Sequence, residues 1–207
     1  MIKHIITNHP NFQIKSFKEY YNNVLVKECH YDDKGELNGL FYENGIHHEK
    51  FHYLNGKIVG LYQYWHDNGQ LAVQCTFNKK GYREGLHQTW YKDGQMHEQF
   101  IFNKKGSLKG SYKRWYENGQ LREQYSYNEK GIREGLSQTW YENGQLAEQS
   151  THNENGEREG LSQSWYDNGQ LASEIQYHNG VLHGHYTSFS YDGDPLNSWF
   201  YENGKKI

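Results

Sequence analysis

Histidine side chains are the first candidates for chemistry in this sequence. The chain has 13 histidines, and His183 and His185 are two residues apart, so in a strand both side chains would project from one face. With His178 they would supply the three protein ligands of an open zinc site. However, His178 and His183 flank the expected turn Asn179-Gly180, and no cysteine or carboxylate completes a ligand set. We therefore expect no metal site and no cofactor.

Two further groups of potential ligands or nucleophiles are equally unpromising. The group His47, His48 and His52 is no better placed, because adjacent strand residues such as His47 and His48 would point to opposite faces. Cys29 and Cys75 stand at equivalent positions two repeats apart, and the hairpins between them would separate them by roughly 19 Å. Because a disulfide needs Cα atoms within about 7 Å, we expect both cysteines to be free, buried, and in a reducing cytoplasm.

Carboxylates offer no catalytic site either. We find no nucleophile elbow, phosphate-binding loop or helical zinc motif in the sequence. Glu98, Glu123 and Glu148 recur at one repeat position, which spreads identical groups along the chain, whereas catalysis needs one asymmetric cluster. We expect a protein that is not an enzyme.

Composition and charge narrow the class of partner. Apolar residues make up only 34% of the chain, but 19 Tyr, 9 Phe and 6 Trp argue against disorder. The 22 basic and 25 acidic residues are intermixed, so there is no single-sign field to attract nucleic acid or anionic lipid. Residues 1–17 lack the apolar run of a signal peptide or membrane span. We expect a cytoplasmic protein that binds neither nucleic acid nor membrane.

A repeat of about 25 residues organises nearly the whole chain. Glycines preceded by Asn or Asp recur at spacings of 24 or 25, and an aromatic residue stands four positions before each. These turn glycines are Gly45, Gly69, Gly94, Gly119, Gly144, Gly169 and Gly193. A weaker copy begins at Tyr20, and a partial copy begins at Tyr201. We predict an N-terminal cap over residues 1–18 and one repeat domain over residues 19–207.

Each repeat predicts a β-hairpin. Aromatic and β-branched runs flank Asn143-Gly144, and Asn-Gly between such runs favours a two-residue type I′ turn. A second turn, such as the one at residues 128–131, joins each hairpin to the next. The sequence thus predicts an all-β protein, an elongated twisted antiparallel β-meander built from hairpin repeats.

Alternation along the strands assigns residues to faces. Residues two, six and eight positions after each turn glycine share one face, for example Leu121, Tyr125 and Tyr127. On the preceding strand, the tryptophan stands four positions before the turn glycine and shares a face with a leucine that stands eight positions before the same glycine. These leucines are Leu61, Leu86, Leu136 and Leu161. We expect both sets to be buried and the residues between them, such as Ser137, to face solvent.

These motifs resemble a known repeat family. The string Trp-Tyr-x-Asn-Gly-Gln-Leu, followed by Tyr/Phe-Asn-x-x-Gly-x-x-x-Gly, resembles the MORN-variant repeat of bacterial YwqK-family antitoxins of toxin–antitoxin systems. The resemblance covers roughly residues 20–204. It implies a twisted β-sheet with a grooved binding surface and, as a function, neutralisation of a cognate toxin by direct binding.

Departures from the repeat, together with a tyrosine column, are our candidates for partner binding. The column lies three positions before the turn glycines. Its tyrosines offer rigid area for contact with a partner. Alternatively, they only stabilise a solvated face of the sheet. The departures occur mainly in the central repeats, at positions where neighbouring repeats carry Ser, Gln, Thr or Ala. The candidate residues are His87, Tyr91, Tyr112, Lys113, Arg114, Tyr116, Arg122, Tyr141 and Tyr166.

Three functions compete on this basis. The first is a cytoplasmic protein-binding module, an antitoxin or immunity protein whose partner is a toxin. The second is a scaffold or membrane-tethering protein of MORN type, against which the mixed charge argues. The third is a glycan or cell-surface binder with aromatic stripes, which would require export.

Overall fold

The computed structural model describes residues 1–44 and 48–207, so the predicted turn at Gly45 and the side chain of His47 lie outside the described residues. The chain divides into two compact units. The first unit comprises residues 1–95 and 102–106, and the second comprises residues 96–101 and 107–207. The predicted boundary at residue 18 falls within a strand of the first unit and stays a prediction.

Both units consist of β-strands. Those of the first unit are β1 (Ile2–Asn8), β2 (Ile14–Tyr21), β3 (Val24–Tyr31), β4 (Leu37–Glu43), β5 (Glu49–Leu54), β6 (Lys57–Trp65), β7 (Leu71–Phe77) and β8 (Gly85–Trp90). Strand β9 (Met96–Phe102) contributes to both units. Those of the second are β10 (Leu108–Trp115), β11 (Leu121–Tyr127), β12 (Arg133–Trp140), β13 (Leu146–His152), β14 (Gly160–Trp165), β15 (Leu171–His178), β16 (Val181–Phe189), β17 (Pro195–Glu202) and β18 (Lys205–Lys206).

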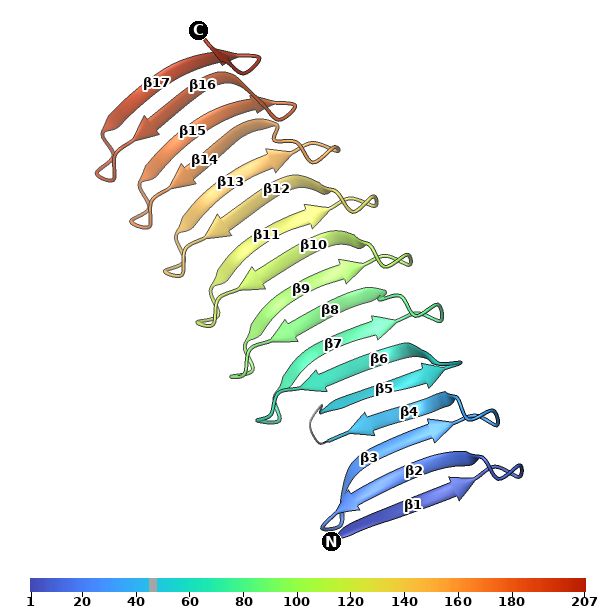
Figure 1. Cartoon of the computed structure of the whole chain (residues 1–207). Helices are drawn as coiled ribbons and strands as arrows, with labels where there is room; N and C mark the ends of the chain where they lie inside the picture. Colours follow the sequence, from blue (N-terminus) through green and yellow to red (C-terminus); the bar gives the residue numbers. More distant parts are fainter. Residues whose placement is uncertain (45–47) are drawn as a thin grey trace. The chain divides into compact units, whose positions relative to one another are not determined.

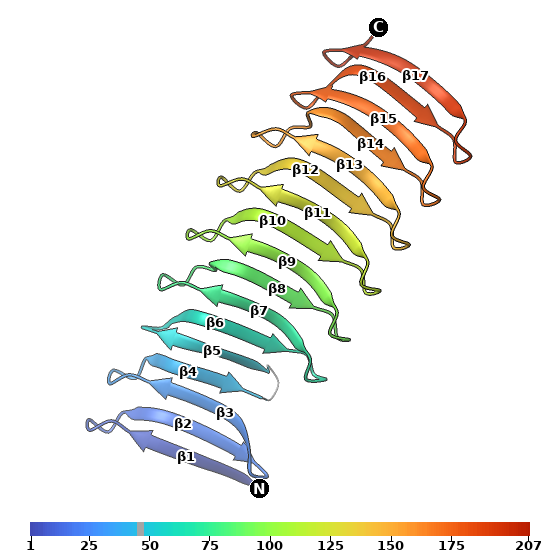
Figure 2. The same ribbon diagram turned by 180° about the vertical axis from the view of Figure 1, so that it is seen from behind.

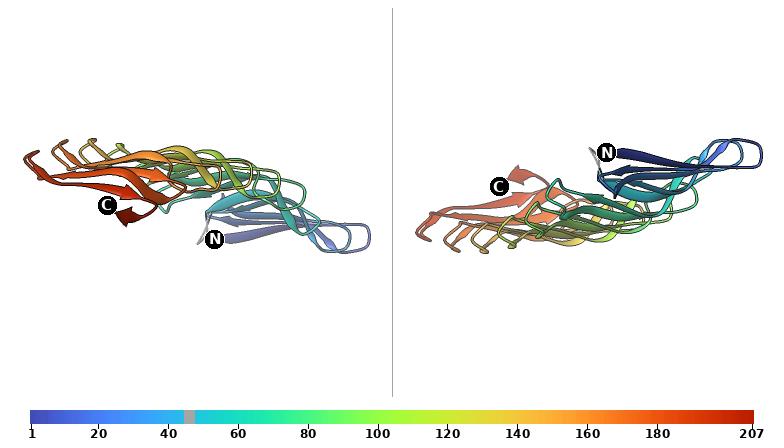
Figure 3. Two further views of the ribbon diagram at one scale, coloured as in Figure 1. Left: turned by 90° about the horizontal axis from the view of Figure 1, so that it is seen from above. Right: turned by 90° about the horizontal axis from the view of Figure 1, so that it is seen from below.

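The strands of each unit form an antiparallel meander. In the second unit each strand from β10 to β17 pairs with the next one along the chain (Figure 1). Figure 2 shows the turns inside hairpins along one edge of this unit and the turns between hairpins along the other. Each unit is a single layer of strands, without a second layer among the described residues (Figure 3). The all-β hairpin prediction is confirmed.

Nowhere in the described ranges is there a helix long and apolar enough to cross a membrane.

The turn inside the hairpin differs from the prediction. Strand pairing ends at Trp140 and Leu146. The Gly144 amide donates to the Tyr141 carbonyl at 2.9 Å, and the Tyr141 amide donates to the Gln145 carbonyl at 2.8 Å. Only Gly144 has positive φ, at 86°, so this is a type I turn followed by a left-handed glycine, and the predicted type I′ turn is wrong. The two-residue type I′ geometry occurs elsewhere, for example at Asn179-Gly180, where φ is 48° and 78°.

The face assignment of the strands also needs correction. Arg114 pairs with Glu123, yet the next residue Trp115 pairs with Leu121, because a bulge at Arg122 adds one residue to β11. Since Arg114 and Trp115 point to opposite faces, Leu121 and Glu123 must do so too. The expectation that the leucine shares a face with Tyr125 and Tyr127 is therefore wrong.

The buried ladder lies on the face that carries Glu123. Ser137 is 3% exposed and pairs with Ser150, which is 4% exposed. The predicted buried leucines are instead exposed; Leu136 is 49% exposed, and Leu61, Leu86 and Leu161 are similar. In a single-layer sheet no second sheet covers a face, so side chains seven positions before and six positions after the turn glycine, such as Ser137 and Ser150, bury one another across strands. Cys29 and Cys75 are free and buried, as expected.

Turn asparagines link successive repeats. The Asn143 side-chain nitrogen donates to the Asp167 carbonyl in the following turn at 2.7 Å, while its oxygen accepts from the Gln145 amide at 2.9 Å. Asn118 and Asn168 make the same pair of hydrogen bonds. Asparagine at this position therefore serves the contact between repeats as well as the turn.

We expect Asn143→Ala to lower the free energy of unfolding by about 1 kcal/mol, because two turn hydrogen bonds are lost in an exposed setting. Urea denaturation followed by circular dichroism would measure the change. Asn155→Ala is the control, since within residues 1–44 and 48–207 the Asn155 side chain makes no hydrogen bond of this kind and its neighbour Asn153 holds that turn. Equal losses for the two variants would contradict the role of Asn143.

Candidate functional site

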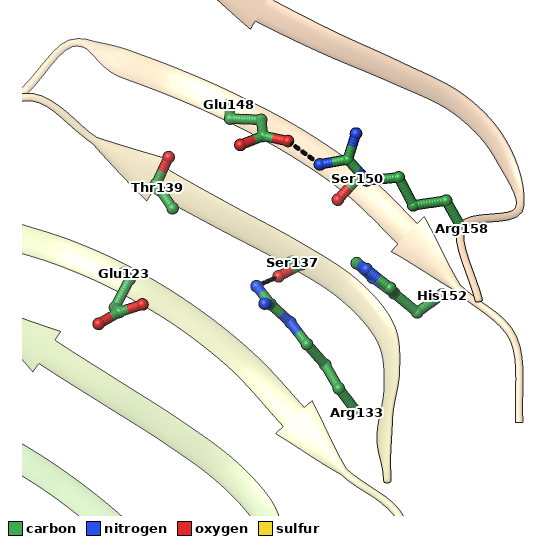
Figure 4. A pocket seen from close by; sticks show the side chains of 8 residues that line it. All are labelled: Glu123, Arg133, Ser137, Thr139, Glu148, Ser150, His152 and Arg158. Carbon is green, nitrogen blue, oxygen red and sulfur yellow. Dashed lines mark hydrogen bonds and ion pairs between the residues drawn. The ribbon is translucent and has the colours of Figure 1, made fainter. Parts of the chain in front are cut away.

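Two adjacent pockets in the second unit bring candidate residues together. The turn-side pocket, of about 310 Å³, is lined by Tyr116, Arg122, Glu123, Thr139, Trp140, Tyr141 and Ala147. The arginine pocket, of about 120 Å³, is lined by Glu123, Arg133, Ser137, Thr139, Glu148, Ser150, His152 and Arg158 (Figure 4). Because Glu123 and Thr139 line both, the pockets share a wall.

The turn-side pocket is built from two successive repeats. The Tyr116 hydroxyl donates to the Trp140 carbonyl at 2.8 Å, and the Tyr141 hydroxyl donates to the Trp165 carbonyl at 2.8 Å. These bonds fix the tyrosine rings at the turns. Arg122 is exposed at the bulge of β11, with its guanidinium 5.4 Å from the centre of the Tyr116 ring. The pocket thus presents fixed aromatic rings beside an accessible cation.

Three of the nine predicted partner-binding residues therefore meet here: Tyr116, Arg122 and Tyr141. Tyr166 stands at the equivalent place one repeat later, where its hydroxyl donates to the Phe189 carbonyl at 2.9 Å. These hydrogen bonds agree with the alternative that the tyrosine column stabilises a face of the sheet. A role of the tyrosine rings in contact with a partner stays a prediction.

The other predicted residues lie elsewhere. Tyr112 lies in the buried ladder, its ring 4.6 Å from that of Tyr125, and Arg114 forms ion pairs with Glu98 at 3.4 Å and Glu123 at 3.7 Å. Lys113 lies on the opposite face of β10, paired with Gln124. His87 and Tyr91 belong to the first unit; His87 is 5% exposed and its ring meets Phe102 edge-on at 6.0 Å.

Small side chains create the arginine pocket. At the ladder position seven residues before the turn glycine, the first two repeats of the second unit have Tyr112 and Ser137. Tyr112 fills its site by stacking on Tyr125, its partner across the strands. Ser137 and Ser150 pair across the strands in the same way but leave space above the sheet. The hollow is therefore a local exception in a repeated ladder.

Two arginines enter this hollow from the ends of strands. Arg133 starts β12, with its guanidinium 3.9 Å from the centre of the Tyr125 ring and a hydrogen bond donated to Ser137 Oγ. Arg158 precedes β14 and donates to Glu148 at 2.5 Å (Figure 4). Both guanidiniums lie over the ladder face.

The charges in the arginine pocket are unevenly paired. Burial lowers the pKa of His152, and the nearby positive charges of Arg133 and Arg158 lower it further, which favours the neutral imidazole. Glu148 is paired with Arg158, and Glu123 with Arg114. Among the described residues no carboxylate lies within ion-pair distance of Arg133. One positive charge is thus left without an anionic partner.

Sequence reasoning did not single out these pocket residues. Arg133 and Arg158 stand fourteen residues after Gly119 and Gly144, and Arg83 stands fourteen after Gly69. This recurrence could have pointed to these residues, because arginines at one repeat position form a row of cations along the ladder face. The two serines were visible too, but Ser137 was expected to face solvent and Ser150 to be buried, so they were not expected to meet.

The histidine groups do not converge. His178 Nδ1 lies 2.9 Å from a Glu159 oxygen, and the rings of His178 and His183 are 6.0 Å apart. In residues 1–44 and 48–207 no three His, Cys, Asp or Glu side chains gather in an arrangement that could hold a metal ion.

Four segments of the chain are similar to a known repeat family. Residues 58–79, 108–129, 133–154 and 158–179 match the family described as the MORN repeat variant. Each matched segment covers one hairpin, such as β10 with β11 or β12 with β13. A search of curated proteins found no match to the chain.

Proposed function

Because this chain carries MORN-variant repeats, we propose that it is a non-enzymatic protein-binding module. More narrowly, we propose an antitoxin or immunity protein that neutralises a toxin by covering part of its surface. The narrower role is supported by the resemblance of the repeat motif to bacterial antitoxins. The general role is supported by one observation, the turn-side pocket in which Tyr116, Arg122, Trp140 and Tyr141 meet.

The chemistry of this pocket suits a protein partner. Tyr, Trp and Arg carry much of the binding energy in protein interfaces, because they combine large apolar area with polar groups that orient it. The hydroxyl groups of Tyr116 and Tyr141 are already bonded to the main chain of the next repeat. Their rings therefore lose little conformational entropy on binding, which favours affinity.

Arg122→Ala tests this proposal with little risk to the fold. Other repeats have alanine at the same position, as in Ala72, Ala147 and Ala172. We expect the variant to weaken capture of the toxin by about 2 kcal/mol, roughly thirtyfold. The measurement is co-purification with the products of neighbouring genes, followed by calorimetry on the captured pair and a growth-protection assay.

Lys130→Ala is the control, because Lys130 is also exposed and cationic but stands in a turn between hairpins. It should bind as the unaltered protein does. If Arg122→Ala binds and protects as well as this control, the turn-side pocket is not the contact surface. If no neighbouring gene product is captured and no toxicity is relieved, the antitoxin proposal fails.

A further inference from the structure

We propose that the arginine pocket binds a single carboxylate, presented by an Asp or Glu side chain of the partner protein. This inference rests on the proposed function, and it adds a chemical preference that the turn-side pocket alone does not supply. It is carried by four features of the second unit: an unpaired guanidinium, hydroxyl groups beside it, the balance of charge, and the shared wall between the pockets.

The guanidinium of Arg133 is positioned but not neutralised. The Tyr125 ring lies against it at 3.9 Å and Ser137 Oγ accepts one of its hydrogen bonds. Its Nε is buried and has no hydrogen-bond partner in the part of the chain that the structure describes. An arginine fixed by a ring presents its planar fork in one orientation, which is the arrangement that recognises a carboxylate.

Hydroxyl groups in the same pocket can add donors. Ser137, Ser150 and Thr139 line the same hollow, and Ser137 lies beside the guanidinium (Figure 4). Serine and threonine hydroxyls rotate to donate to an acceptor. A carboxylate has two oxygens that can accept from the guanidinium and a hydroxyl together. The pocket therefore offers several convergent donors to one small anion.

The balance of charge selects a monoanion. Arg158 is committed to Glu148, and Arg114 is shared between Glu98 and Glu123, so among the described residues Arg133 is the cation of this cluster without a carboxylate within ion-pair distance. A doubly charged phosphate would face Glu123 and Glu148 with one free cation, and like charges at close range are costly. A carboxylate brings a single negative charge and is therefore repelled less by Glu123 and Glu148.

Size and position connect the pocket to the partner surface. A volume of about 120 Å³ admits a side-chain carboxylate and excludes a nucleotide or a sugar chain. Glu123 and Thr139 form the wall shared with the turn-side pocket. A partner segment that lies over this shared wall in the turn-side pocket can thus place an acidic side chain in the arginine pocket.

A small probe tests the carboxylate preference without the partner. N-acetyl-glutamate methylamide carries one side-chain carboxylate, and N-acetyl-glutamine methylamide is its neutral counterpart. NMR titration of the full chain should show saturable shifts at Arg133, Ser137 and Ser150 with the acid and none with the amide. Arg133→Gln should weaken binding of the acid roughly tenfold or more, because charge-assisted hydrogen bonds are lost.

Arg83→Gln is the matched control. Arg83 has the same repeat position in the first unit, 6.0 Å from the centres of the Phe77 and Phe102 rings. It should leave the affinity for the probe unchanged. Arg133→Lys keeps the charge but lacks the planar fork, so it should recover only part of the affinity. A thermal melt of each variant confirms folding.

Several outcomes would overturn the inference. These are the absence of saturable shifts with the acid, equal binding by the amide, an unchanged affinity in Arg133→Gln, and tighter binding of inorganic phosphate than of the acid. Failure of the proposed function is distinguishable. If the acid binds through Arg133 but no partner is captured, the carboxylate site is supported and the proposed function fails. If a partner binds Arg133→Gln and the unaltered chain equally, the proposed function is supported and the carboxylate site fails.

Discussion

Replacing Phe51 with alanine should lower the free energy of unfolding by about 3–5 kcal/mol. Phe51 is 4% exposed. Its ring lies 4.8 Å from that of Phe41, 5.1 Å from that of Tyr53 and 5.6 Å from that of Tyr62. Truncation would remove the central member of this cluster and leave a cavity that the strands can only partly close. Urea denaturation monitored by circular dichroism would measure the loss.

Leu61→Ala is the control for this prediction. Leu61 was expected to be buried, yet 47% of its surface is exposed. Its truncation should cost about 1 kcal/mol or less, since much of its apolar area already contacts water. If Leu61→Ala proves as destabilising as Phe51→Ala, the ladder face has been assigned to the wrong side of the sheet.

Replacing Tyr125 with alanine should destabilise the second unit by about 2–4 kcal/mol. The Tyr125 ring stacks on Tyr112 at 4.6 Å, meets Tyr127 edge-on at 5.5 Å and lies against the Arg133 guanidinium at 3.9 Å. Both the stacking and the cation–π contact would be lost. Denaturation curves would measure the stability, and hydrogen exchange of the β11 and β12 amides would localise the loss.

Tyr125→Phe separates the ring from its hydroxyl. It keeps the stacking surface, so its cost should stay near 1 kcal/mol, and Arg133 should remain in place. The affinity of the arginine pocket for a carboxylate should then survive in Tyr125→Phe and decline in Tyr125→Ala. The same decline in both variants would contradict the positioning of Arg133 by the ring.

Hairpins and their order were predictable from sequence, whereas the faces of the strands were not. The turn glycines and flanking β-formers locate each hairpin because both signals are local. The bulge at Arg122 is different, since it depends on how β11 pairs with β10. Simple alternation from the turn glycine ignores the extra residue at the bulge, and it therefore places Leu121 on the wrong face. Pairing across strands decides burial here, and no single strand reveals it.

The turn type failed for a related reason. Asn-Gly favours a two-residue turn when the strands end beside it, as at Asn179-Gly180. In the central repeats the pairing of Trp140 with Leu146 sets a longer loop, so Asn143 keeps a negative φ and donates to the next repeat. The same dipeptide thus serves two turn geometries according to strand register.

The candidate site was predicted in part, and the missed part is instructive. Arg122 attracted attention because it departs from the repeat, and it does line the turn-side pocket. Arg133 was passed over because it conforms to the repeat. Its surroundings are what differ, since Ser137 and Ser150 replace the bulky pair Tyr112 and Tyr125 of the preceding hairpin. A regular residue acquires an irregular role when its neighbours change.

The turn asparagines give the repeat array a direction. Asn118 donates to Glu142 and Asn143 donates to Asp167, each toward the repeat that follows in the chain. Because the acceptor is always a main-chain carbonyl, the bond does not depend on which side chain the next turn carries. If a whole repeat were duplicated or deleted, each turn asparagine at the new junction would still have a main-chain carbonyl to which it can donate. An array with such junctions can therefore change length in steps of one hairpin without redesigning any junction.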